Sequence, residues 1–202
     1  MIRRPPRSTL SSSSAASDVY KRQYQGVPIG GFTQMFEKML DGIEVKLNKD
    51  YFYMKNYYNS IADKIVYTGC IDEFFDYKYG ELGYRSLKFE TDILDTENYQ
   101  GCAVINQCDH SEEYTRTVEH KHFEKVKTDH TVITREYPIE YKRGMIPYYP
   151  INTKENAEMY DKYRKESKTL TNIIFGGRLA EYKYMDMHIV IESAMNKFRS
   201  AQ

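Results

Sequence analysis

The segment 173–194, IIFGGRLAEYKYMDMHIVIESA, carries the residue types with the clearest chemical use. An apolar run leads into Gly176 and Gly177, where backbone without side chains can approach a ligand closely. Asp186 stands near the start of a predicted last helix, where free N–H groups and the helix dipole favour acceptors and anions. Taken alone, the segment also has the pattern of a glycine turn followed by an Asp N-cap. The segment is therefore a candidate ligand site that needs support from the rest of the chain.

His120 and His122 lie two residues apart and would share one face of a strand. A metal site needs three or four converging ligands, and no Cys or carboxylate partner is evident for this pair. We interpret both as polar strand residues that support a pocket, with Glu119 and Glu124 balancing charge. The sequence predicts no metal site.

Hydrophobic periodicity and glycine stops predict the elements that position these residues. The predicted helices cover 32–40, 153–169 and 186–198, with one or two helical turns at 72–79. The predicted strands cover 43–47, 64–69, 87–91, 102–106, 114–123, 131–137 and 172–175. Successive strands joined by short polar turns indicate an antiparallel sheet, so the fold class is α+β. The last helix is expected to bury Met187, Ile191, Ala194 and Met195.

Composition bounds the class of protein. Hydrophobic residues make up 41% and charged residues 29% of the 202 residues, and the formal net charge is zero. No clustered basic field of the kind that binds nucleic acid is present. Cys70, Cys102 and Cys108 form an odd set without CxxC spacing, which favours a reducing compartment. Without an apolar run of about 20 residues, we expect no membrane span and a cytoplasmic protein.

Residues 1–23 differ from the remainder. They are rich in Arg and Ser, contain a Pro pair, and show neither helical nor strand periodicity. They resemble translated sequencing-adapter DNA, so we expect a non-native, disordered leader. The domain prediction is therefore a leader at 1–23 and a folded region at 24–202.

Several motifs occur in order along residues 24–202 with sensible spacing. They are VPIGGFTQMFEKML (27–40), ADKIVYTG (62–69), EFFDYKYGELGYRSLKFET (73–91), YTRTVEHKHFE (114–124), TVITREYP (131–138), PYYPIN (147–152) and FGGRLAEYKYMDM (175–187). This ordered set resembles the UDP-galactopyranose mutase family. The resemblance covers essentially all of residues 24–202.

The resemblance implies a fold and an activity. The family pairs an antiparallel substrate-binding sheet, of six strands, with a Rossmann-like FAD-binding domain, to which segments near 62–80 and 172–202 would belong. The implied reaction is flavin-dependent interconversion of UDP-galactopyranose and UDP-galactofuranose through a covalent adduct between flavin N5 and the sugar. FAD acts in its reduced form, and the product supplies surface glycans.

Site residues follow from the motif matches. Arg116 matches an arginine that contacts the diphosphate, and Tyr149 and Tyr184 match tyrosines that hydrogen-bond the same phosphates. Arginine suits this role because its planar fork meets phosphate oxygens bidentately. Asp186 matches a pocket carboxylate, and Arg85 matches another pocket arginine.

Flavin contacts are expected at the end of the chain. Arg178 matches an arginine near the flavin, and Gly177, Asp186 and Met187 are expected to face it. The family's phosphate-binding GxGxxG motif is absent from the 202 residues. We therefore expect a fragment that is inactive alone. The resemblance also allows a homo-oligomer for the full-length enzyme.

Two other interpretations remain open from sequence. An amine-oxidase-type flavin oxidoreductase shares the late Gly-Gly, strand and helix element, but would oxidise its substrate. A non-catalytic sheet module that binds sugar nucleotides would bind UDP without flavin.

Overall fold

The computed structural model describes residues 26–109, 111–124 and 126–201, so the predicted leader 1–23 lies outside the described residues. The chain forms two units with their boundary between Val45 and Lys46.

The first unit contains one described helix, α2 (Gly31–Met39), as predicted. Gly30 precedes it with φ 81°, a left-handed conformation that favours glycine. The predicted strand at 43–47 is wrong, because these residues take turn and irregular backbone. An alternating apolar pattern becomes a strand only when a neighbour supplies hydrogen bonds, and no described strand pairs there.

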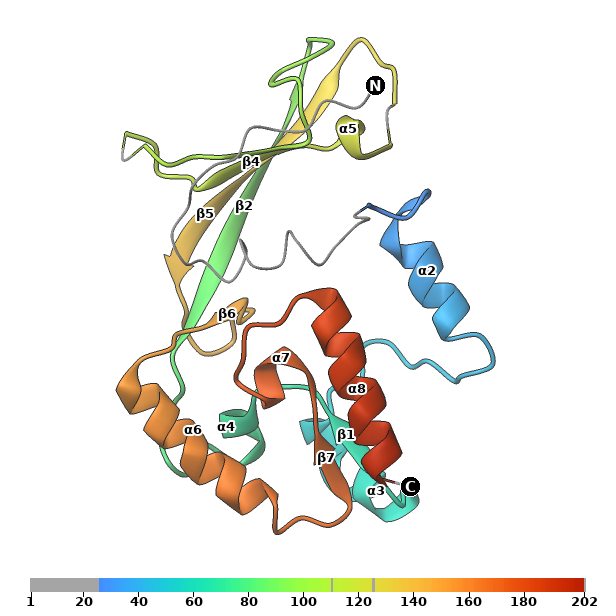
Figure 1. The fold of residues 1–202 in the computed structure, drawn as a ribbon, viewed down its shortest axis with the longest axis vertical. Coiled ribbons are helices and arrows are strands. Elements are labelled where there is room, and N and C mark those ends of the chain that lie inside the picture. Colours follow the sequence, from blue (N-terminus) through green and yellow to red (C-terminus); the bar gives the residue numbers. More distant parts are fainter. Residues whose placement is uncertain (1–25, 110, 125, 202) are drawn as a thin grey trace. The chain divides into compact units, whose positions relative to one another are not determined.

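The second unit contains a five-stranded antiparallel sheet in the order β3-β4-β5-β2-β6. Its strands are β2 (Tyr84–Leu94), β3 (Val104–Asn106), β4 (Arg116–Glu119), β5 (Thr131–Glu140) and β6 (Tyr149–Pro150). The longest ladder joins β2 to β5, from Arg85 opposite Glu140 to Leu94 opposite Thr131, and these strands are the two long ribbons of Figure 1. The described strands are one fewer than the resemblance implies.

β4 is shorter than the predicted strand 114–123, because it ends at Glu119 and is followed by the helical turn α5 (Lys121–Glu124). The Glu119 side chain is fully buried and accepts the backbone N–H groups of Tyr99 and Gln100. A buried carboxylate requires such donors, and the turn after β4 also brings His122 Nε2 to 3.1 Å from Glu119 Oε2. His120 and His122 therefore do not form one strand face.

The remaining elements surround a parallel pair of short strands, β1 (Ile65–Tyr67) and β7 (Ile173–Phe175). The helices are η1 (Phe52–Met54), α3 (Lys55–Ile61), α4 (Ile71–Phe74), α6 (Lys154–Ser167), α7 (Gly177–Ala180) and α8 (Met187–Ala201). A parallel pair needs a long crossover, and here the crossover contains the whole antiparallel sheet. Together the elements confirm the α+β class.

Tyrosines build much of the core. Tyr163 of α6 and Tyr182 pack with Cys70, Ile71, Leu82 and Tyr84, a group that we call the tyrosine core. The Tyr163 hydroxyl donates to the Gly80 carbonyl at 2.6 Å and accepts the Tyr79 N–H at 3.0 Å. The Tyr182 hydroxyl lies 2.5 Å from the Gly83 carbonyl oxygen and 2.9 Å from that of Ile151. Rings fill the interior while hydroxyls satisfy loop carbonyls.

The predicted inner face of α8 is wrong. The four residues expected to be buried, Met187, Ile191, Ala194 and Met195, are exposed. Ser193 and Lys197 instead lie on a partly buried side of the helix. Both polar residues contact Glu181, and this polar contact sets the rotation of the helix. Among the described residues, no helix is long and apolar enough to cross a bilayer.

Candidate functional site

Tyr149, Arg178 and Tyr184 form a cluster, which we call the tyrosine–arginine cluster. Tyr149 comes from β6, Arg178 from α7, and Tyr184 from the segment between α7 and α8. The two tyrosine rings stack with centroids 6.0 Å apart. The Arg178 guanidinium lies 5.4 Å from the Tyr149 ring centroid and 5.0 Å from that of Tyr184. Three residues predicted from two separate motifs are therefore brought together.

Hydrogen bonding orients this cluster. Arg178 Nη2 donates to the Tyr148 carbonyl at 3.2 Å. Arg178 Nε is buried and has no hydrogen-bond partner within the described part of the chain. A buried N–H of a cation without an acceptor is costly, so the cluster is suited to receive an anionic or polar ligand oxygen.

The Tyr184 hydroxyl links the cluster to Asp186. It donates to Asp186 Oδ1 at 3.4 Å. Burial raises the pKa of Tyr184, and the nearby Asp186 carboxylate raises it further. The phenol is therefore a hydrogen-bond donor at neutral pH, which suits a phosphate acceptor.

Arg85 lies beside the cluster on the same face of the sheet. Its Cα pairs with that of Tyr149 across β2 and β6, and directly opposed residues point to the same face. The Arg85 carbonyl also accepts the Tyr148 N–H at 3.0 Å. Its side chain is exposed, so it can reach a ligand that lies on this face.

Arg116 lies on the same face but further along the sheet. Arg116 pairs with Glu136 of β5, and Glu136 pairs in turn with Phe89 of β2. Phe89 and Arg85 are four residues apart on β2, so their side chains point to the same face of the sheet. Four residues along β2 and three strand spacings across separate the Arg116 and Tyr149 backbones by roughly 20 Å on the sheet. The described contacts of Arg116 are with Asn106 Oδ1 at 2.9 Å and Glu136 Oε2 at 3.4 Å.

Phe89 and Tyr148 lie between Tyr149 and Arg116 on this face of the sheet. Their rings meet edge to face with centroids 5.7 Å apart, and the Tyr148 ring lies 6.5 Å from that of Tyr149. Sequence reasoning did not assign a role to either residue, although PYYP placed Tyr148 next to a predicted site residue. The face is thus a continuous surface from the cluster toward Glu136.

The Gly176-Gly177 turn borders an apolar cavity of about 630 Å³. Gly177 has a φ of +84°, a backbone conformation that would be strained in a residue with a side chain. Six of the lining residues are Val66, Thr68, Gly177, Val190, Ala194 and Phe198. An apolar cavity beside a glycine turn fits one side of a planar flavin ring system. The described residues supply this wall but contain no glycine-rich phosphate loop.

The start of α8 lies close in sequence to the cluster. The Asp186 carbonyl accepts the Val190 N–H at 3.0 Å, so Asp186 is in the N-cap position. Met187, the first helical residue, is half exposed. Both predicted flavin-facing residues are thus at a helix N-terminus, where an anion or acceptor is favoured.

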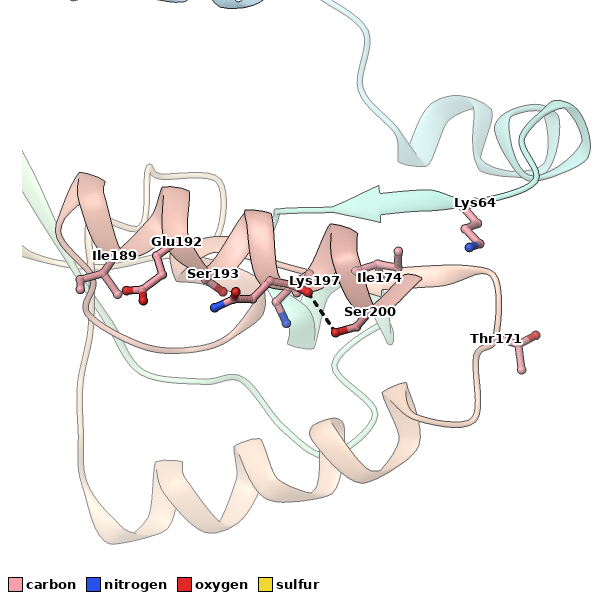
Figure 2. Close-up of a pocket in the computed structure, with 9 residues that line it drawn as sticks. Lys64, Thr171, Ile174, Ile189, Glu192, Ser193, Lys197 and Ser200 are labelled. Carbon is pink, nitrogen blue, oxygen red and sulfur yellow. Dashed lines mark hydrogen bonds between the residues drawn. The ribbon is translucent and has the colours of Figure 1, made fainter. Parts of the chain in front are cut away.

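A second groove, of about 770 Å³, lies along α8 and shares no residue with the tyrosine–arginine cluster (Figure 2). Its walls include Lys64, Ile189, Glu192, Ser193, Lys197 and Ser200. It is open and polar, and we assign it no ligand.

The histidines have structural partners. His120 Nε2 lies 2.8 Å from Thr134 Oγ1, and His122 Nε2 lies 3.1 Å from Glu119 Oε2. Burial alone would raise the pKa of Glu119, but hydrogen bonds from Gln100, Tyr99, Thr131 and His122 lower it to about 2. No group of His, Cys, Asp and Glu that could hold a metal occurs in the described ranges.

Comparison with known proteins agrees with the sequence motifs. The family model for UDP-galactopyranose mutase (GLF) matches residues 9–184. A dTDP-fucopyranose mutase of Escherichia coli is 34% identical over 183 residues, covering 86% of this chain and 48% of that protein. A UDP-galactopyranose mutase of Mycoplasma genitalium is 36% identical over 188 residues, covering 86% and 46%.

A probable UDP-galactopyranose mutase of Klebsiella pneumoniae is 34% identical over 177 residues, covering 87% of this chain and 46% of the relative. The chain therefore spans about half the length of the curated relatives that it matches. Because the family model matches most of the chain, the chain belongs to the UDP-galactopyranose mutase family.

Proposed function

We propose that this chain contributes the diphosphate-binding and flavin-facing groups of an isomerase that interconverts UDP-galactopyranose and UDP-galactofuranose. The observation that carries the proposal is the tyrosine–arginine cluster within a chain of this family. Two phenols and a guanidinium on one surface are the donors that a diphosphate requires.

The diphosphate is assigned to the sheet face. Tyr149 and Tyr184 donate hydroxyl hydrogen bonds to phosphate oxygens, and Arg85 and Arg116 supply positive charge from β2 and β4. In favour of this role, all four side chains belong to one continuous surface or border it. A sugar nucleotide lying along the surface would replace the Glu136 contact of Arg116 with a phosphate contact.

The flavin is assigned to the other side of the cluster. Arg178, Gly177, Asp186 and Met187 would hold it, and the parallel pair β1–β7 with α8 would belong to its Rossmann-like domain. Support comes from the apolar cavity beside Gly177 and the helix start at Met187. A reduced FAD held by these residues would supply a nucleophile for the anomeric carbon of the sugar.

The protein residues hold the departing UDP and orient the sugar. Positively charged and hydroxyl groups fixed at the diphosphate stabilise the charge that develops as the bond to the sugar breaks. Tyr184, kept protonated by its raised pKa, is a donor throughout. Without a ligand, Asp186 holds the Tyr184 hydroxyl through their hydrogen bond, and a phosphate oxygen would replace Asp186 as the acceptor.

Titration of the chain with UDP, measured by calorimetry, tests the assignment of the sheet face, a property that a non-catalytic sugar-nucleotide module would share. The Tyr184→Phe and Arg85→Ala variants are expected to weaken UDP binding by about 5- to 50-fold, because each removes a charge-assisted hydrogen bond. The control is Tyr53→Phe, which removes a hydroxyl from a tyrosine that is 89% exposed in η1. An unsubstituted chain that does not bind UDP would overturn the assignment of the sheet face.

Catalysis is tested separately. Because the chain has no GxGxxG motif, we expect weak FAD binding and no conversion of UDP-galactofuranose when the chain is mixed with reduced FAD. Chromatography of the sugar nucleotides measures this, and turnover by the chain would contradict the expectation of inactivity.

A further inference from the structure

Three hydrogen-bond donors surround one carboxylate oxygen of Glu181. Glu181 Oε1 lies 3.2 Å from the Gly177 backbone nitrogen, 3.0 Å from Ser193 Oγ and 3.4 Å from Lys197 Nζ. Gly177 belongs to the turn that begins α7, while Ser193 and Lys197 belong to α8. A single carboxylate oxygen therefore joins two elements of the candidate site.

The local geometry explains why a carboxylate stands here. Glu181 is the C-cap of the four-residue α7, and its side chain returns to the first residue of that helix. The first N–H groups of a helix have no partner within the helix, and Gly177 in addition holds a positive φ of 84°. The Glu181 carboxylate satisfies this N–H and so stabilises the turn.

The α8 side of the contact is equally specific. Ser193 and Lys197 are four residues apart, so they lie one turn apart on one side of α8, and Figure 2 shows both on the groove side with Glu192. The Lys197 stem also covers Gly176, since a Cβ at Gly176 would lie 3.5 Å from Lys197 Cδ. The contact thus packs α8 against both glycines of the turn.

We propose that Glu181 is a positioning residue for the candidate site. It holds the Gly176-Gly177 turn and α8 in one arrangement, and because α7 carries Arg178, it also fixes Arg178 beside Tyr149 and Tyr184. Its effect on ligand binding rests on the proposed function, whereas its effect on the turn does not.

Amide hydrogen exchange of the chain, measured by NMR, tests the positioning role without any ligand. Glu181→Ala should raise the exchange rate of the Gly177 amide about tenfold, since it removes a hydrogen bond to a charged acceptor. Glu181→Gln keeps an acceptor oxygen and should partly restore protection. The control Glu192→Gln removes an exposed carboxylate from the adjacent α8 position and should leave Gly177 unchanged.

Amides of the β2–β5 ladder report on global stability. Faster exchange at Gly177 with unchanged exchange at Ile133 supports a local role. Should Glu181→Ala unfold the chain, Glu181→Gln decides alone: a smaller rise at Gly177 supports the proposal. An unchanged Gly177 rate in the Gln variant, or in a folded Ala variant, overturns it.

UDP titration of the same variants tests the link to the site. Glu181→Ala should weaken UDP binding several-fold, and equal affinity would overturn that link. Absence of UDP binding even by the unsubstituted chain would instead overturn the proposed function, and the exchange rates at Gly177 would still decide the positioning role.

Discussion

The tyrosine core and the tyrosine–arginine cluster use the same residue type in opposite ways. Tyr163 is fully buried, and its hydroxyl bonds to backbone groups of residues 79 and 80. Tyr184 is 55% exposed, and its ring stacks on Tyr149 and on the Arg178 guanidinium. A hydroxyl bonded to buried backbone groups holds the fold, whereas the Tyr184 hydroxyl, bonded to the Asp186 side chain, can exchange that partner for a ligand.

Truncation of each ring should separate the two roles most strongly. Tyr163→Ala is expected to destabilise the chain by about 3–5 kcal/mol, because it removes a large buried ring and leaves a cavity. Tyr184→Ala should cost less than about 1 kcal/mol, since the ring is half exposed. Urea unfolding followed by circular dichroism measures both, and similar losses would break the comparison.

Alkaline pH is expected to destabilise the chain through the tyrosine core. Burial raises the pKa of Tyr182 from 10.0 to about 12. A raised folded-state pKa contributes stability that is fully present below pH 10 and is lost as the pH rises toward 12, by about 3 kcal/mol in total. Unfolding curves at pH 9 to 12 test this, and Tyr182→Phe should flatten the loss.

Removal of single hydroxyls sharpens the comparison further. Tyr163→Phe leaves the Tyr79 N–H without its acceptor and should cost about 1–2 kcal/mol of stability. Tyr184→Phe should leave stability within about 0.5 kcal/mol while weakening UDP binding. Urea denaturation measures the stability and calorimetry measures the UDP affinity of each variant. A stability loss for Tyr184→Phe as large as for Tyr163→Phe would argue against a Tyr184 hydroxyl that is available to a ligand.

A loss of stability smaller than that of Tyr163→Phe is expected for the cation stack. Arg178→Lys keeps the charge but loses the planar contact with both rings, and should cost about 0.5–1 kcal/mol. Arg199→Lys, in the exposed last turn of α8, is the matched control. Equal stability of the two variants in urea would show that the stack contributes nothing to folding.

Local sequence patterns predicted most elements. The helices near residues 32–40, 153–169 and 186–198 and five of the seven strands occur close to their predicted positions, because periodicity and glycine stops act within one element. The strand at 43–47 failed for lack of a partner, and the strand at 114–123 was cut short at Glu119. Both errors depend on neighbours that are distant in sequence.

The sequence motifs also named the residues of the tyrosine–arginine cluster, but they did not predict how these residues are arranged. The motifs named Arg178, Tyr149 and Tyr184, yet only the pairing of β6 with β2 and the position of α7 bring them into contact. Glu181 had no distinctive signal, since a Glu between two turns is ordinary in sequence. Its three donors come from residues 177, 193 and 197.

The sequence by itself determined the family, the α+β class and the residue types able to bind a diphosphate. The tertiary structure decided which tyrosines are buried, which face of α8 packs inward, and how far Arg116 lies from the cluster. The physical reason is that side-chain chemistry and local periodicity depend only on each residue and its near neighbours in the sequence. Burial and polar contacts, in contrast, depend on which distant segments supply hydrogen-bond partners.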